Sequence, residues 1–184
     1  ELARPNRFDV YMFPPPGISD NYAVTASSST QLMYRCEIAQ LPGRTFATTD
    51  QRTYGPIEKY PYLTTYNDLD LTFIVTDDMK EKLFFDTWIE YINPKTTNNF
   101  GYKEDYSTDL LINQYDLSNN LTYSADLIEA FPIDVNQMDL RWDSVDTAHK
   151  LSVVFAYKQW QNNTVSSIIQ QTKNSALTGA IELL

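Results

Sequence analysis

Regular alternation of apolar and polar residues runs through most of this sequence and constrains its fold more than any other feature. In an extended strand, successive side chains point to opposite faces, so an alternating segment places one face on a core and the other toward solvent or a partner. The alternating segments are Phe8–Met12, Leu32–Ile38, Leu69–Val75, Tyr123–Leu127, Met138–Trp142 and Leu151–Tyr157. We therefore predict a mainly β chain of half-buried antiparallel strands.

One segment breaks this alternation and predicts a single helix over about residues 78–92. Its sequence, DMKEKLFFDTWIEYI, places Phe84 and Trp88 on one stripe at helical spacing. Asp78, with Glu81 three residues later, has the pattern of a capping box, and the Asn-Pro pair after the segment favours its end there. We predict that the aromatic stripe packs against the sheet as core.

Aromatic residues on the apolar faces of these segments are the candidate core. A chain of 184 residues is long enough to bury one sizeable core. Cys36 is the only cysteine, so no disulfide can form within the chain, and we expect it to be buried as a small hydrophobe. The candidate core residues are Phe73, Phe84, Trp88, Trp142 and Phe155.

Three polar segments interrupt the strands and predict loops or arms: Pro14–Thr30, Pro42–Pro61 and Lys95–Thr108. The segment Pro42–Pro61 mixes charges of both signs with strand-forming aromatic residues. A disordered loop does not need the aromatics and a buried strand does not carry the charges, whereas an arm lying on a neighbouring subunit uses both. The candidate inter-subunit contacts are Arg44, Phe46, Arg52, Tyr54, Glu58 and Lys59.

Residues that could carry catalysis or bind a metal are scarce and scattered. His149 is the only histidine, so no multi-histidine metal site can form, and it lies in a polar turn before a strand. The sequence contains no nucleophile elbow, phosphate-binding glycine loop or calcium loop. The adjacent acids Asp77 and Asp78 are explained by the start of the helix. We predict that the chain is not an enzyme and takes no cofactor or metal.

The acidic net charge and the lack of long apolar runs argue against two kinds of partner, nucleic acid and the membrane interior. A net charge of −10 argues against direct gripping of nucleic acid, because phosphate binding needs a surface rich in lysine and arginine. No apolar run approaches the roughly 20 residues needed to cross a bilayer, so we expect no membrane span. Abundant aromatics with dispersed charges indicate a folded chain.

Several blocks occur in the order and spacing of a known family. ARPNRFDV at 3–10 and CEIAQLPG at 36–43 come first, and DLDLTFIV at 68–75 precedes the helix. The block 130–144, with its proline turn and Trp-Asp-Ser, then leads to the aromatic strand 151–160. Over roughly residues 3–160 the sequence resembles the tail tube protein of contractile-tailed, T4-type bacteriophages. That family is related to the tubes of type VI secretion systems and R-type bacteriocins.

The resemblance implies a tail tube domain over residues 1–160 and a C-terminal extension over 161–184. Within the domain, 14–30 is an insertion-like loop, 42–61 an interaction arm and 78–92 the helix. The implied fold is an antiparallel β-sandwich or barrel-like tail tube fold with one flanking helix and extended interaction loops.

The resemblance also implies a function. Six subunits close a ring, and the rings stack into a hollow tube inside a contractile sheath, which delivers the genome into the host cell. The implied partners are further copies of the chain, the sheath protein, the baseplate tube-initiator, a tape-measure protein in the lumen and viral DNA in transit without sequence-specific binding. The implied location is the virion tail, with assembly in the host cytoplasm.

Two other functions stay open on the sequence. A baseplate tube-initiator shares the tube fold but usually carries added domains, which this sequence does not contain. A carbohydrate-binding β-sandwich of a tail fibre would use Trp88, Trp142 or Trp160 as a platform for a sugar. The first two lie on apolar faces, which favours core positions, and Trp160 lies at a strand end.

Overall fold

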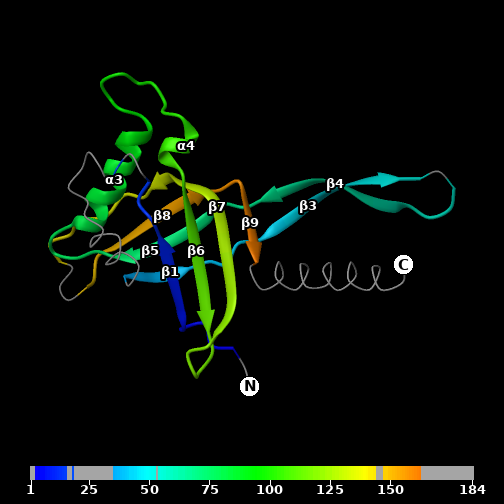
Figure 1. The fold of residues 1–184 in the computed structure, drawn as a ribbon, viewed down its shortest axis with the longest axis horizontal. Coiled ribbons are helices and arrows are strands. Elements are labelled where there is room, and N and C mark those ends of the chain that lie inside the picture. Colours follow the sequence, from blue (N-terminus) through cyan, green and yellow to red (C-terminus); the bar gives the residue numbers. More distant parts are fainter. Residues whose placement is uncertain (1–2, 16–17, 19–34, 53, 144–146, 163–184) are drawn as a thin grey trace, which may run out of the picture.

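The apolar–polar alternation forms antiparallel strands over most of the chain (Figure 1). A computed structural model describes residues 3–15, 18, 35–52, 54–143 and 147–162. The strands are β1 (Phe8–Met12), β2 (Cys36–Ala39), β3 (Arg44–Gln51), β4 (Glu58–Tyr66), β5 (Leu69–Ile74), β6 (Thr108–Tyr115), β7 (Leu121–Val135), β8 (Lys150–Ala156) and β9 (Gln159–Asn162). The helices are α3 (Lys80–Ile92) and the short α4 (Lys103–Tyr106). The chain is mainly β with one long flanking helix, which confirms the predicted fold class.

Seven strands form one antiparallel sheet in the order β1-β6-β7-β8-β5-β2, with β9 also paired to β7. Phe8 lies opposite Gln114 in the β1–β6 ladder, and Leu69 lies opposite Phe155 in the β5–β8 ladder. Within the described residues no ladder joins β1 to β2, so the sheet stays open and one chain does not close a barrel.

Strand β7 bends at Glu129, and this bend lets its two parts pair with different strands. Its first part pairs with β6 and β9, and its last part pairs with β8. Glu129 has a φ of 54°, which is uncommon for a residue other than glycine. Its N–H donates to Asp109 at 3.1 Å, and its carboxylate pairs with Lys158 at 2.5 Å and Lys103 at 3.0 Å. Hydrogen bonds from these two lysines lower the pKa of Glu129 and hold the bend in place.

The core lies where α3 packs against the sheet. Trp88 is fully buried, with its ring centroid 5.7 Å from that of Phe84 and 6.1 Å from that of Phe155. Its indole N–H donates to the backbone oxygen of Tyr106 at 2.8 Å. Phe73 packs beside them, 5.2 Å from the ring of Phe85. Four of the five candidate core residues are therefore buried: Phe73, Phe84, Trp88 and Phe155.

The placement of Trp142 in the core is wrong. Its side chain is 105% exposed, and Leu140 beside it is 86% exposed. Residues 138–143 alternate in sequence but form no strand. The segment lies in the connection between β7 and β8, which pair directly with each other, so alternation alone did not make it a strand.

The helix α3 starts two residues later than predicted, and the expected capping box is not formed. Met79 is the cap residue, with a φ of 52°, and no side chain caps the first turn. Glu81 is buried and accepts hydrogen bonds from the N–H of Thr76 at 3.1 Å and its hydroxyl at 3.0 Å. It also forms an ion pair with Arg35, whereas Asp78 stays at the surface. Glu81 therefore joins the helix to the strand ends instead of capping it.

Three further expectations concern the loop 14–30, the extension 161–184 and Cys36. Of the insertion-like loop 14–30, only residues 14, 15 and 18 are described; Ile18 is buried and donates its N–H to Pro15 at 3.0 Å. The extension 161–184 lies outside the described residues beyond 162. Cys36 is half-buried against the core, and burial raises the pKa of its thiol to about 12.

Candidate functional site

A long β-hairpin made of β3 and β4 projects from the body of the molecule (Figure 1). It continues the ladder between β2 and β5 in the same register. Ala39 lies opposite Leu71 in that ladder, and five residues further along each strand Arg44 lies opposite Tyr66. The interruption contains Pro42, which has no N–H to donate to a ladder. The hairpin is therefore an outward extension of the sheet, anchored at its base.

Almost every described residue of the hairpin is exposed, on both of its faces. The exposed set includes six large apolar or aromatic side chains, with exposed fractions from 47% to 101%. They are Phe46, Tyr54, Ile57, Tyr60, Tyr62 and Leu63. A two-stranded hairpin is at best marginally stable alone in water, and apolar surface of this kind marks an interaction site. The hairpin is suited to lie on the surface of another molecule.

The residues predicted to contact a neighbouring subunit all lie on this hairpin or its tip. The guanidinium of Arg44 lies 5.1 Å from the ring centroid of Phe46. Glu58 accepts a hydrogen bond from the hydroxyl of Tyr60 at 2.6 Å. The structure thus brings the predicted set onto one projecting element, and its contacts with a neighbour stay a prediction. The set is Arg44, Phe46, Arg52, Tyr54, Glu58 and Lys59.

The two ends of the sheet offer a second kind of surface. β1 and β2 each have one side without a ladder among the described residues. The unpaired N–H and C=O groups of such an edge can pair with a strand of another chain. Joining edges between copies would remove them, as closure of a barrel does. Sequence patterns predicted these strands but did not show that they lie at the edges.

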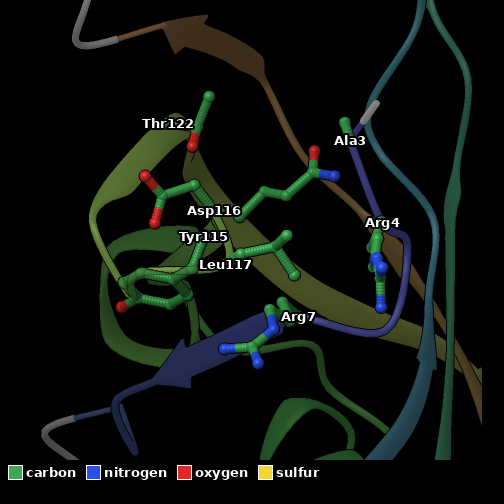
Figure 2. A pocket seen from close by; sticks show the side chains of 8 residues that line it. Ala3, Arg4, Arg7, Tyr115, Asp116, Leu117 and Thr122 are labelled. Atoms are coloured by element: carbon green, nitrogen blue, oxygen red, sulfur yellow. The ribbon is translucent and has the colours of Figure 1, made fainter. Parts of the chain in front are cut away.

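A small hollow of about 180 Å³ lies between the N-terminal segment and the turn that joins β6 to β7 (Figure 2). Ala3, Leu117 and Thr122 are among its lining residues, and Arg4 and Arg7 line it from the N-terminal segment. Figure 2 shows Leu117 facing the two arginines across this space. Sequence patterns did not point to this hollow, because its walls lie more than a hundred residues apart in the chain.

Asp116 shapes the wall of the hollow through its own turn. One carboxylate oxygen accepts the N–H groups of Ser118 at 2.7 Å and Asn120 at 2.8 Å, and the other accepts the side-chain amide of Asn120 at 3.0 Å. Hydrogen bonds from Asn120 lower the pKa of Asp116. Arg7 donates to Asn119, whose φ is 62°, at 2.6 Å. An aspartate that bonds the backbone of its own turn is typical of such loops, and its carboxylate is occupied there.

The described residues hold no catalytic arrangement that we recognise. His149 is half-buried, with Nε2 2.9 Å from the backbone oxygen of Asp139. Among the described ranges, no group of three histidine, cysteine or acidic side chains could hold a metal ion. None of the described helices is both long and apolar enough to cross a membrane.

The tryptophans considered as a sugar platform have three different surroundings. Trp88 is fully buried and out of reach of a ligand, whereas Trp142 is fully exposed. The indole N–H of Trp160 donates to the backbone oxygen of Gly43 at 3.3 Å, where the chain enters the hairpin. Trp160 therefore helps to anchor the hairpin at its base.

Comparisons with known proteins find a phage tail tube family and structures of contractile injection systems. A family model described as phage tail tube protein matches residues 3–163. A solved structure described as the sheath/tube terminator of the extracellular contractile injection system PVC has a TM-score of 0.62 and 14% identity, covering 89% of this chain and 97% of that chain. A structure described as the anti-feeding prophage baseplate, 6-fold symmetrised, has a TM-score of 0.61 and 15% sequence identity. The match covers 88% of this chain and 95% of that chain. A structure described as the PVC sheath–tube complex has a TM-score of 0.57 and 13% sequence identity. The match covers 89% of this chain and 92% of that chain. No curated protein matches the sequence.

Proposed function

The chain belongs to the phage tail tube protein family, and from that premise we propose that six copies close a ring and that rings stack into a hollow tube inside a contractile sheath. The chain is a structural, non-enzymatic component of the phage tail. The tube is the conduit through which the genome enters the host cell.

The exposed β3–β4 hairpin carries this proposal. It presents aromatic surface and charges of both signs well away from the core of its own subunit. Such an element gains stability only when a neighbour covers it. The open edges at β1 and β2 add surfaces through which copies can continue one another's sheet. Both features favour self-assembly over binding of a small ligand.

The similar structures support two further parts of the proposal. The anti-feeding prophage baseplate is described as 6-fold symmetrised, which supports a ring of six. The PVC structure is described as a sheath–tube complex, which supports a sheath as partner. A baseplate tube-initiator at one end and a tape-measure protein in the lumen complete the proposed set of partners.

The acidic charge of the subunit suits a conduit for DNA. The net charge of −10 supports the further proposal that acidic side chains face the lumen, and such a wall repels phosphate instead of holding it. At physiological salt this repulsion acts over about 8 Å, so it prevents sticking near the wall. DNA therefore passes without sequence-specific binding.

The size of the purified chain in EDTA tests the proposal. We expect hexamers or larger particles in sedimentation velocity, and rings or tubes in negative-stain electron microscopy, because assembly needs no metal. A strict monomer at high concentration would contradict the proposed self-assembly. Single rings that do not stack would instead favour the tube-initiator role, since the similar structures include a baseplate.

A further inference from the structure

Glu129 in the bend of β7 occupies a backbone position that usually belongs to glycine. Between Leu127 and Ala130, two residues of β7 lie opposite the single residue Asp109 of β6, which makes a β-bulge. Glu129, the second of these two residues, has a φ of 54°. Where a bulge contains a residue in the left-handed region, glycine is the usual choice because it has no Cβ. A glutamate in this place indicates that its side chain does something that glycine cannot do.

The side chain of Glu129 is held from two other elements. One carboxylate oxygen lies 2.5 Å from Nζ of Lys158 in the β8–β9 turn, and the other lies 3.0 Å from Nζ of Lys103 at the start of α4. The backbone N–H of Glu129 donates to Asp109 at 3.1 Å. We call Glu129 and these three partners the β7 clamp. The β7 clamp joins α4, β6, β7 and the β8–β9 turn at one point.

The β7 clamp lies between the two open edges of the sheet. In the strand order β1-β6-β7-β8-β5-β2, every described ladder path from β1 to β2 passes through β7. The pairing of β7 with β9 ends at Ile128, and its pairing with β8 begins at Phe131. Figure 1 shows the strand curving between these two parts. A change in the bend at Glu129 therefore turns the edge at β1 relative to the edge at β2.

We infer that the β7 clamp sets the angle between the two edges and thereby the number of copies that close a ring. The inference rests on the proposed function, because it requires that copies join through these edges. Each copy turns the wall by about 60° in a ring of six and by about 51° in a ring of seven, since a closed ring divides a full turn equally. A drift of only about 9° in the bend of each copy is then enough to change the number of copies.

Charged hydrogen bonds fix such an angle better than apolar packing does. The hydrophobic effect is non-directional, whereas hydrogen bonds weaken steeply as their geometry changes. The left-handed conformation of Glu129 is also unfavourable for a residue with a Cβ, so it persists only while its surroundings hold it. The two lysines bind the carboxylate from different elements, and a shift of either element breaks a contact. Glu129 is therefore a positioning residue for ring closure.

Counting the copies in each ring tests the inference. Glu129→Ala removes the carboxylate, and Glu129→Gly removes it while also suiting the left-handed backbone. Lys103→Met with Lys158→Met leaves Glu129 in place and removes both of its cations. In top views by negative-stain electron microscopy, rings of other than six copies should be at least about fivefold more frequent for these variants than for the wild type, because several bend angles then become populated. A clamp that only stabilises the subunit would lower the melting temperature and leave the ring number unchanged.

A matched control lies on α3, away from the bend. The side chains of Glu90 and Glu129 are both 34% exposed, and Glu90 also pairs with a lysine, Lys95, at 3.4 Å. Glu90→Ala produces the same change in net charge as Glu129→Ala and should leave the rings at six copies. Circular dichroism should show a native fold for each variant, and Lys103→Met with Lys158→Met decides the question if the Glu129 variants do not fold. Rings of six in every folded clamp variant would overturn the inference and leave the proposed function standing.

Distances along β7 test the angle without relying on rings. In a Cys36→Ala background, Leu121→Cys and Ile133→Cys place spin labels on the two parts of β7, at side chains that are 56% and 46% exposed. Labelled chains are diluted with unlabelled chains of the same variant, so that double electron–electron resonance reports distances within one copy. The distance distribution should be at least about twofold wider with Glu129→Gly than with the wild-type clamp or with Glu90→Ala, because the bend then samples more angles. Equal widths would overturn the inference. Absence of rings in the wild type would contradict the proposed function, whereas a wider distribution would still support control of the angle by the β7 clamp.

Discussion

At the scale of single residues, Trp88 and Trp142 have similar sequence patterns and opposite surroundings. Trp88 is fully buried among aromatic rings and donates to Tyr106, whereas Trp142 is fully exposed. Trp88→Ala should therefore lower the free energy of unfolding by about 3–5 kcal/mol, because it leaves a cavity and an unpaired carbonyl. Trp142→Ala should change it by no more than about 0.5 kcal/mol. Urea denaturation followed by circular dichroism measures both, and equal losses would contradict the two placements.

This pair also shows what the sequence could predict about the core. Helical spacing placed Trp88 on the face with Phe84, and that face is the one that α3 buries. Alternation placed Trp142 on an apolar face as well, but alternation shows only which side chains would share a face. A strand also needs a neighbouring strand to pair with, and sequence periodicity does not reveal that β7 and β8 pair with each other and leave this segment as their connection.

At the scale of elements, a buried ion pair joins α3 to the sheet. Glu81 is 2% exposed at its side chain and Arg35 is 30% exposed. Arg35→Ala should cost about 3 kcal/mol of unfolding free energy, because it leaves a buried carboxylate without its cation. Glu81→Gln should cost less, about 1–2 kcal/mol, because the freed arginine reaches water. Urea denaturation of the two variants checks this order, and the reverse order would contradict it.

A control for the ion pair lies on the same helix. Lys80 pairs with Asp78 at 2.6 Å, and the two side chains are 55% and 63% exposed. Lys80→Ala should cost no more than about 0.5 kcal/mol, as exposed pairs generally do. The sequence predicted the helix from its periodicity but assigned Glu81 to a capping box. Its actual partners, Thr76 and Arg35, come from the strand ends before the helix, and local spacing does not reveal such contacts.

The hairpin leads to a prediction about assembly. Arg44→Glu with Arg52→Glu should leave the circular dichroism spectrum of the subunit unchanged, because both side chains are exposed on an element outside the core. The same variant should impair stacking in electron microscopy, since charges at the rim of an interface mainly set orientation and register. Normal tubes would show that these arginines do not matter to assembly. Loss of the fold would show that the hairpin supports its own subunit.

The arm and the hollow differ in how far sequence could predict them. The arm is continuous in sequence, so its mixture of aromatics and charges could be recognised there. The hollow joins Arg4 and Arg7 to Leu117, which meet only because β1 pairs with β6. Sequence spacing does not show that the N-terminal segment and the β6–β7 turn lie side by side.

At the scale of the whole molecule, the net charge leads to a prediction about salt. Copies that each carry a charge of −10 repel one another, and this repulsion extends over about 30 Å at 0.01 M salt but only about 8 Å at 0.15 M. Exposed ion pairs within the contacts are worth at most about 1 kcal/mol each and act at short range. The concentration needed for assembly should therefore fall as salt rises to the physiological range.

A more acidic variant extends this prediction. Arg44→Glu with Arg52→Glu lowers the net charge from −10 to −14, so the concentration that this variant needs for assembly should depend more steeply on salt. Light scattering across a salt series measures both thresholds. A wild-type threshold that rises steadily with salt would mean that attraction between local charges, and not net repulsion, controls assembly.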